Sequence, residues 1–365
     1  MRKLVIQVTL LAILLLGLPL FGVWIAGVSV SKYLEFPPRS IYVEHASFSL
    51  FYSIACGLIF LGAVIPILIK GIRTPENRVR GTLSRRFPWW GLLGIGINLG
   101  SWVLAWSRFS WFRMIQPHTF SLLWVSFIVI VNAICYRRDG RCMMTHQPLY
   151  FFLLFPASAA FWWFFEYLNR FVQNWIYIGP LIDASSYGIF GTLSFSTVLP
   201  AVLGVKEWIY GTERIQMNFH SGYKVKALNS KIWIWVLLIL SGTGLAGVGV
   251  WPNFLFPLLW ISPLFMITSV QILFDEEHIF SQITDGDWRG LISAALSALL
   301  CGWFWEMWNF YSLSKWEYRI PFVQRFHVFE MPILGYAGYL PFGLECTAVG
   351  NLVKQSMDEF KKTLT

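Results

Sequence analysis

Residues 163–180 read WFFEYLNRFVQNWIYIGP, and residues 303–321 read WFWEMWNFYSLSKWEYRIP. Each stretch is rich in aromatic residues and carries a glutamate followed three residues later by an asparagine: Glu166 with Asn169, and Glu306 with Asn309. Because residues three apart lie on one face of a helix, the two polar groups of each copy are expected on the same side. A carboxylate in apolar surroundings is costly unless it is paired or used. The repetition therefore predicts a position that the fold requires.

Each copy continues into an aromatic loop. The first has Trp175, Tyr177 and Pro180, and the second has Trp316, Tyr318 and Pro321. Other matches follow in the same order along the chain, namely 122–126 with 258–262, Leu193 with Leu334, and Pro200 with Pro341. Matches that recur in order indicate an internal duplication of the chain.

The composition is that of a membrane protein. Of the 365 residues, 56% are hydrophobic and 13% are charged, whereas soluble domains carry about 25% charged residues. Apolar runs of about 20 residues, enough to cross a bilayer, recur along the whole length. They predict an all-α polytopic membrane protein with about ten transmembrane helices, at 4–29, 48–71, 89–107, 117–136, 149–168, 186–205, 232–251, 257–274, 289–308 and 330–352.

Lysine and arginine residues indicate the orientation. Most of the 28 basic residues fall in segments that lie inside when both termini are inside, as the positive-inside rule requires. We therefore expect a multi-pass protein of a bacterial-type inner (cytoplasmic) membrane with both termini cytoplasmic. Anionic inner-leaflet lipid then explains the formal net charge of +9, so no nucleic-acid partner is required. The first apolar run is too long for a signal-peptide core and is expected to remain as a helix.

The duplication divides the chain into three parts. Residues 1–88 hold two helices and a basic inner loop, 89–231 the first four-helix repeat, and 232–365 the second repeat with an inner tail. Both repeats begin on the inner side, so they are expected to run parallel, related by a pseudo-twofold axis along the membrane normal. Each Glu-x-x-Asn falls at the outer end of its helix. The next helix returns through an interior proline, Pro200 or Pro341, which should bend it.

The polar residues shared by the two copies leave two interpretations open. Intramembrane carboxylates are functional by default, so Glu166 and Glu306 are candidate catalytic acids. Near a helix end they also suit a half-solvated interfacial belt. Asn169 and Asn309 either contact a substrate or end their helices by bonding the last carbonyls. The other candidate substrate contacts are the loop rings Trp175, Tyr177, Trp316 and Tyr318.

The second copy carries polar groups that the first copy lacks. They are His327, Glu330 and Glu345, and the first copy has Ile189 and Gly204 opposite the two glutamates. Such asymmetry is typical of one active and one supporting copy. Glu345 is predicted to lie deepest in the membrane, which makes it the sharpest candidate acid, with Glu330 as a further acid and His327 as a substrate contact. The alternative is that Glu345 has a structural role, neutral or paired with another group within the helix bundle.

Several other chemistries are excluded. The six histidines fall in loops or at helix edges, so a haem held by two histidines between facing helices is not expected. The sequence has no phosphate-binding loop, no GxGxxG in a strand–helix setting, no GxSxG and no HExxH. The five cysteines form no CxxC and indicate no disulfide framework. We therefore expect neither a metal nor a cofactor.

The second repeat resembles membrane-embedded carotenoid cyclases of the lycopene cyclase type. The resemblance rests on Trp316-x-Tyr318 and on Phe329-Glu330-Met331-Pro332-Ile333. That family has tandem small helical units in which a Trp-x-Tyr loop leads into a helix opened by a proline-acid motif. Here Ile333-Leu334 follows the proline, where the family has paired acids. The resemblance implies an isoprenoid substrate, whose acid-triggered chemistry needs a neutral carboxylic acid and aromatic faces that stabilise a carbocation.

Three functions remain open from the sequence. One is a membrane enzyme or binding protein for a long apolar molecule (isoprenoid, carotenoid or lipid) with Glu306, Glu330 or Glu345 as the acid. The second is an ion-coupled transporter, which parallel repeats and intramembrane acids suit. The third is a haem-free, quinone-binding membrane subunit of a respiratory complex. The sequence does not determine the oligomeric state or a protein partner.

Overall fold

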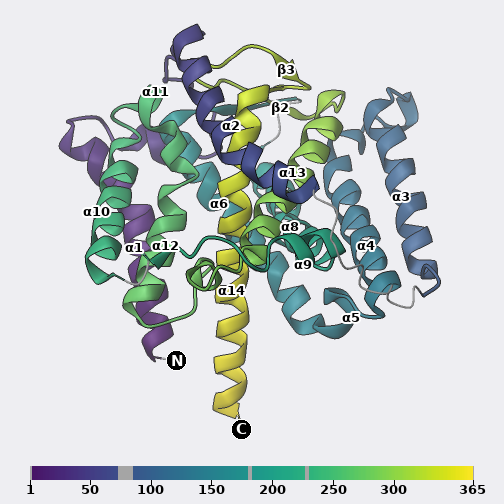
Figure 1. Cartoon of the computed structure of the whole chain (residues 1–365). Coiled ribbons are helices and arrows are strands. Elements are labelled where there is room, and N and C mark those ends of the chain that lie inside the picture. Colours follow the sequence, from purple (N-terminus) through teal and green to yellow (C-terminus); the bar gives the residue numbers. More distant parts are fainter. Residues whose placement is uncertain (1, 73–84, 180–182, 227–229, 365) are drawn as a thin grey trace.

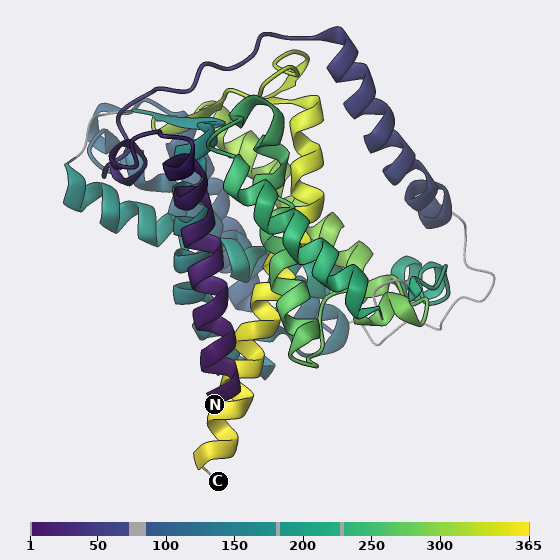
Figure 2. The ribbon, with the colours of Figure 1, turned by 90° about the vertical axis from the view of Figure 1, so that its left-hand side faces the viewer.

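The computed structural model describes residues 2–72, 85–179, 183–226 and 230–364, so Pro180 and most of the predicted basic inner loop lie outside the described residues. The protein is mostly helical, with short strands. Figures 1 and 2 show both chain termini at the same end of the molecule. This end is called the inner end below, and the opposite end, which carries the strands, is called the outer end.

The elements follow one another along the chain in this order. The helices are α1 (Arg2–Ile25), α2 (Leu50–Ile72), α3 (Trp89–Trp106), α4 (Thr119–Asp139), α5 (Met143–His146), α6 (Pro148–Val172), α7 (Ala184–Phe195), α8 (Val198–Tyr210), α9 (Glu213–Asn218), α10 (Lys231–Gly247), α11 (Pro252–Leu255), α12 (Ser262–Leu273), α13 (Arg289–Phe310) and α14 (Tyr339–Leu364). The strands are β1 (Trp175–Ile178), β2 (Lys315–Tyr318), β3 (His327–Val328) and β4 (Met331–Pro332). The 3-10 turns used below are η5 (Phe256–Leu259) and η7 (Ile333–Gly338).

Several helices are long and apolar enough to cross a membrane, as expected for a multi-pass protein. Within the described residues there are six: Lys3–Ile25, Leu50–Ile72, Gln116–Asp139, Pro148–Val172, Ala184–Tyr210 and Arg289–Phe310. A seventh would be the pair Pro252–Leu259 and Ser262–Leu273, which is bent by 47°. The predicted count of ten is therefore not confirmed. The helix of the last predicted span starts late, because 331–338 form β4 and η7, and the far half of α14 carries charges such as Lys354 and Asp358.

The two prolines that were expected to bend helices both lie in the first turn of a helical segment. The stretch predicted as one helix at 186–205 divides into α7 and α8, and Pro200 is in the first turn of α8. Pro341 is in the first turn of α14. A proline is tolerated there because the first backbone N–H groups of a helix have no intrahelical partner. Pro341 therefore begins a helix, whereas Pro200 lies within the candidate span Ala184–Tyr210, just after the break that divides this span into α7 and α8.

The centre of the molecule is built from α6, α8, α13 and α14. The helix α13 packs against both α8 and α14, and α6 packs against the same two helices. In Figure 1, α3 and α4 flank this group on one side, and α1, α10 and α12 flank it on the other. Trp162 of α6 and Trp305 of α13 have ring centroids 6.4 Å apart, and Phe342 of α14 contacts both rings. The two motif helices therefore share one aromatic core.

The aromatic loops of the two copies meet at the outer end. β1 and β2 pair antiparallel, with Trp175 opposite Tyr318 and Tyr177 opposite Trp316. Segments far apart in the sequence thus form one two-stranded sheet above the motif helices (Figure 1). The pairing is symmetric between the two copies, because the tryptophan of each loop lies opposite the tyrosine of the other loop.

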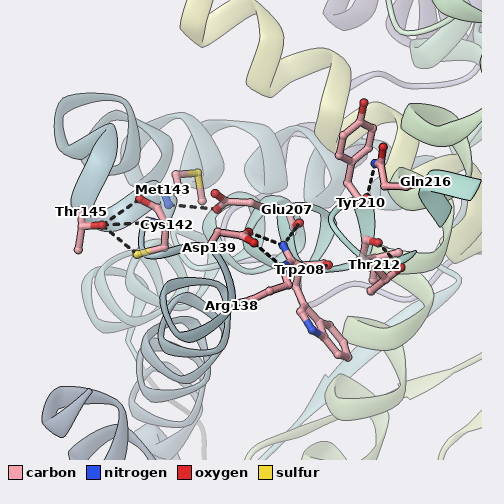
Figure 3. Close-up of polar contacts among 11 residues, drawn as sticks. Arg138, Asp139, Cys142, Met143, Thr145, Glu207, Trp208, Tyr210, Thr212 and Gln216 are labelled. Carbon is pink, nitrogen blue, oxygen red and sulfur yellow. Dashed lines mark hydrogen bonds and ion pairs between the residues drawn. The ribbon is translucent and has the colours of Figure 1, made fainter. Parts of the chain in front are cut away.

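An ionic cluster at the inner end joins α4 to α8 (Figure 3). The guanidinium of Arg138 donates to the carbonyl oxygens of Trp208, at 2.6 Å, and Glu207, at 3.3 Å, and it pairs with Asp139 at 2.7 Å. A cation at these carbonyls stabilises the C-terminal end of a helix. The Glu207 carboxylate in turn accepts from the backbone N–H of Met143, at 3.1 Å, which fixes the turn after α4.

Candidate functional site

The carboxylate of Glu166 is the polar centre of the first copy. Its Oε1 accepts from Trp162 Nε1 at 3.0 Å, from Trp175 Nε1 at 3.0 Å and from the Tyr177 hydroxyl at 2.6 Å. Trp162 lies one helical turn away on the same face of α6, and alternate residues of β1 point to one side of the strand. The carboxylate therefore ties the aromatic loop to its helix.

Glu306 has the same role in the second copy. Its Oε1 accepts from the hydroxyls of Tyr318, at 2.7 Å, and Tyr339, at 2.6 Å, and Trp316 Nε1 donates to the Tyr318 hydroxyl at 2.8 Å. Burial and the neighbouring Glu306 hold the pKa of Tyr318 well above its ordinary value, so this hydroxyl keeps its proton and donates. The residue Glu306 is fully buried, and its Oε2 has no hydrogen-bond partner among the described residues.

The two carboxylates receive one of their donors from different elements. In the first copy this donor is Trp162, four residues before Glu166. The residue four before Glu306 is Gly302. A β-carbon on Gly302 would lie 2.4 Å from the Tyr339 ring, so the absence of a side chain leaves room for that ring. Tyr339 therefore supplies the donor that an indole supplies in the other copy.

The helices that follow in the chain, α8 and α14, differ in the complementary way at their first turns. Tyr339 stands two residues before Pro341, and Val198 stands two residues before Pro200. In the first copy the large donor Trp162 is on α6 and the smaller Val198 is on α8. In the second copy the small residue, Gly302, is on α13 and the large donor, Tyr339, is on α14. The carboxylate environment is kept although the residues that make it differ.

The two asparagines close the loops rather than the helices. Asn169 Nδ2 donates to the carbonyl of Trp175 at 2.8 Å, and Asn169 Oδ1 accepts from the Trp175 N–H at 3.4 Å. Asn309 makes the same pair of bonds with Trp316, at 2.8 and 2.9 Å. The expectation that they bond the last helical carbonyls is therefore replaced by a clamp on the tryptophan of each strand, the first residue of β1 and the second residue of β2.

The clamp predicts a clear loss of stability in Asn309→Ala. The substitution leaves the part-buried N–H and C=O of Trp316 without their side-chain partners, and two lost hydrogen bonds cost about 1–2 kcal/mol. Thermal unfolding of the detergent-purified protein, followed by tryptophan fluorescence, should show a lower midpoint. Asn351→Ala, at an exposed position of α14, is the matched control and should unfold like the wild type. Equal midpoints for the two variants would contradict the clamp.

Glu345 accepts a backbone hydrogen bond at the start of α12. Its Oε1 accepts from the N–H of Leu264, at 3.1 Å, in the first turn of that helix. A carboxylate at a helix N-terminus satisfies an orphan donor and interacts favourably with the helix dipole. Glu345 is fully buried, and its Oε2 has no partner among the described residues. This geometry gives the residue a structural contact between α12 and α14.

The other residues specific to the second copy lie in the outer loops. Glu330 accepts from Lys315 Nζ at 2.6 Å, and Lys315 also lies 3.4 Å from Glu317. His327 is exposed, and its Nε2 lies 3.2 Å from Gln324 Nε2. Among the described residues, no hydrogen bond or ion pair joins His327, Glu330 and Glu345, so the structure does not bring them together as one site.

A large cavity lies between α2 and the rest of the protein. Its volume is about 1450 Å³. No residue of α2 is buried, and Figure 2 shows this helix standing apart from the body. The predicted site residues that line the cavity are Glu166, Asn169, Trp175, Tyr177, Trp316 and Tyr318. Glu306, Asn309, His327, Glu330 and Glu345 are not among its lining residues.

The cavity also has lining residues that sequence reasoning did not select. They include Cys56 and Ala63 of α2, together with Arg170, Asn174 and Tyr187 near the outer end. The guanidinium of Arg170 lies 3.0 Å from Glu35. An arginine inside an apolar helix is a signal that could have been used. Nothing in the sequence indicated that α2 would stand opposite the motif loops.

Comparison with known proteins gives no relative on which to base a function. No protein-family model, curated protein or solved structure matches this chain. The function therefore has to be argued from the cavity and from the residues that line it.

Proposed function

We propose that the chain is an integral, multi-pass protein of a bacterial-type inner membrane with both termini on the cytoplasmic side. The long apolar helices and the common end of the two termini support this proposal. The predicted excess of basic residues on the inner side supports the orientation.

We further propose that α3–α8 and α10–α14 are two parallel repeats, preceded by α1 and α2. Two parallels support this. α3 packs on α4 and α4 on α8, just as α10 packs on α12 and α12 on α14. The asparagine clamp also recurs with the same partners in each copy. The duplication would give the protein a shared aromatic centre with one carboxylate from each repeat.

The function we propose is the binding of a long apolar molecule, such as an isoprenoid, carotenoid or lipid, in the cavity beside α2. The observation that carries this proposal is the cavity itself, whose volume of about 1450 Å³ exceeds the roughly 300–1,000 Å³ of most small-molecule pockets. Its lining is largely apolar and aromatic, with Glu166 and Tyr177 among its few polar groups. Glu166 is thus the carboxylate of the motif that a bound molecule would meet.

Filling the cavity tests the proposal. Ala63→Trp places an indole on the cavity side of α2, whereas Leu61→Trp places one on a half-exposed position of the same helix that does not line the cavity. We expect mass spectrometry of extracts from the purified wild type to show an enriched long-chain molecule. Its amount should fall at least about tenfold in Ala63→Trp, because the indole removes the apolar contact area, and stay unchanged in Leu61→Trp.

Two results would count against the proposal. One is a wild-type extract with the same lipid composition as the membrane from which the protein was purified. The other is equal retention of the enriched molecule by Ala63→Trp and Leu61→Trp, with both variants folded.

A further inference from the structure

Two lysines, Lys206 of α8 and Lys354 of α14, come together near the inner end. The two helices pack against each other, and both run toward this end: α8 ends at the ionic cluster of Figure 3, and α14 ends at the C-terminus. A β-carbon on Gly350 would lie 2.6 Å from Leu203 Cδ1, so these two residues face each other. Lys206 stands one turn beyond Leu203 on that face of α8, and Lys354 stands one turn beyond Gly350 on that face of α14. Their positive charges accordingly repel each other.

Neither lysine has a carboxylate partner among the described residues. The nearest acids along the two helices are Glu207 and Asp358. The carboxylate of Glu207 accepts from the backbone N–H of Met143, at 3.1 Å, and is directed at the turn after α4. Asp358 is exposed, one turn beyond Lys354. The protein therefore leaves the two charges uncompensated.

Three arginines in the apolar helices show the contrast. Each has a carboxylate close by: Arg138 at 2.7 Å, Arg170 at 3.0 Å and Arg289 at 2.6 Å. Lys206 is half-buried, and the charge beside it is a second cation. A lysine in this position keeps its stem against apolar surface and extends its ammonium group toward the boundary of the membrane. An anion from outside the protein can meet it there.

The start of α6 borders the two lysines and adds an apolar surface. The hydroxyl of Tyr150 donates to the carbonyl of Gly350 at 3.2 Å, so α6 meets α14 one turn before Lys354. Leu153, one turn farther along the same face of α6, is 37% exposed, and Leu149 is 53% exposed. An apolar strip thus leads from the lysines toward the outer end.

An anionic phospholipid is complementary to this arrangement. Phosphate oxygens accept charge-assisted hydrogen bonds from ammonium groups, and basic sites between membrane helices on the cytoplasmic side bind anionic lipid head groups. A zwitterionic head group would bring an ammonium of its own to two cations. The acyl chains of the lipid match the exposed leucines of α6.

We infer that Lys206 and Lys354 bind the phosphate of an anionic phospholipid, with an acyl chain along Leu149 and Leu153. The site lies where α6, α8 and α14 meet, and none of these four residues lines the cavity beside α2. It is therefore a second site, separate from the one proposed for the long apolar molecule. The bound lipid compensates the two charges and ties α14 to α8.

Lipid-dependent thermal stability tests the inference. Delipidated protein in a neutral detergent is titrated with phosphatidylglycerol, phosphatidylcholine or inorganic phosphate, and unfolding is followed by tryptophan fluorescence. We expect phosphatidylglycerol to raise the unfolding midpoint at an at least about tenfold lower concentration than phosphatidylcholine. Inorganic phosphate at the same concentrations should have no effect, because it lacks the chains that contact α6.

Variants of the two lysines identify the site. Lys206→Met and Lys354→Met should each weaken the effect of phosphatidylglycerol about tenfold and leave that of phosphatidylcholine unchanged. Lys206→Arg keeps the charge and should respond like the wild type. Lys224→Met removes the same net charge at an exposed position outside these helices and is the matched control. Without lipid, Lys206→Met should unfold no earlier than the wild type, because it removes a repulsion and no partner.

Three results would overturn the inference. One is an equal effect of phosphatidylglycerol and phosphatidylcholine on the wild type, a comparison that stands even if a variant fails to fold. Another is an equal loss of the phosphatidylglycerol effect in Lys224→Met and in the two site variants, which would show a response to net charge alone. The third is stabilisation by inorganic phosphate as strong as that by phosphatidylglycerol, which would identify a site for a free anion. Each of them leaves the proposed cavity ligand unaffected.

Discussion

Gly302→Trp is expected to destabilise the protein strongly, and Tyr339→Val is expected to rescue it. Alone, the indole at Gly302 overlaps the Tyr339 ring, whose carbon lies 2.4 Å from the position of a β-carbon, and costs about 3 kcal/mol. Alone, Tyr339→Val removes a ring and a donor to Glu306, at a cost of about 3 kcal/mol. In the double variant the indole fills the space and supplies its N–H, as Trp162 does for Glu166. The coupling should be about 1–3 kcal/mol in favour of the pair.

Thermal unfolding of the two single variants, the double variant and the wild type measures this coupling as a double-mutant cycle. Gly96→Trp is the matched control, because no atom lies within 4 Å of a β-carbon at that position. It should unfold near the wild-type temperature. If the loss of stability in the double variant equalled the sum of the losses in the single variants, an indole at 302 would not replace the Tyr339 hydroxyl as the donor to Glu306.

The second large effect is expected for Glu306→Leu. The buried hydroxyls of Tyr318 and Tyr339 both lose their acceptor, and each unpaired hydroxyl costs about 1–3 kcal/mol. Glu306→Gln keeps a carbonyl oxygen that accepts both bonds, so it should retain most of the stability. The difference in unfolding midpoint between the two variants measures the hydrogen bonding separately from the shape of the side chain.

Glu330→Gln is the control for this comparison. Glu330 is ion-paired with Lys315 but partly exposed, and such pairs contribute about 0–1 kcal/mol. If Glu306→Leu and Glu306→Gln unfolded at the same temperature, the tyrosine hydroxyls would not depend on this carboxylate. A ligand-binding defect in Glu306→Gln without loss of stability would point instead to a direct role in function.

The membrane class and the helical content could be predicted from the sequence because both depend on local composition. The count of spans could not, because it depends on where helices begin. Pro341 was expected inside a helix but stands in the first turn of α14, and Pro200 follows the break that divides the span Ala184–Tyr210 into α7 and α8. Only the packing of the preceding segments, α7 and η7, decides between these alternatives.

The site was predicted in part. The carboxylates, asparagines and loop rings of the repeated motif do form two hydrogen-bonded clusters, because short-range spacing places them on the same faces. The partners of Glu345 and Arg170 could not be predicted, since Leu264 and Glu35 are distant in the sequence. The cavity depends on where α2 lies, and its apolar sequence is compatible with contact to lipid on every face.

The pairing of β1 with β2 restricts how the two halves of the molecule can move. A rocking motion that parted the halves at the outer end would break the backbone bonds between 175–178 and 315–318 and pull each Asn-clamped loop from its helix. Motions that preserve the sheet must pivot about it, so the outer end acts as a fixed hinge. A molecule of the proposed class would then enter and leave the cavity sideways, past α2.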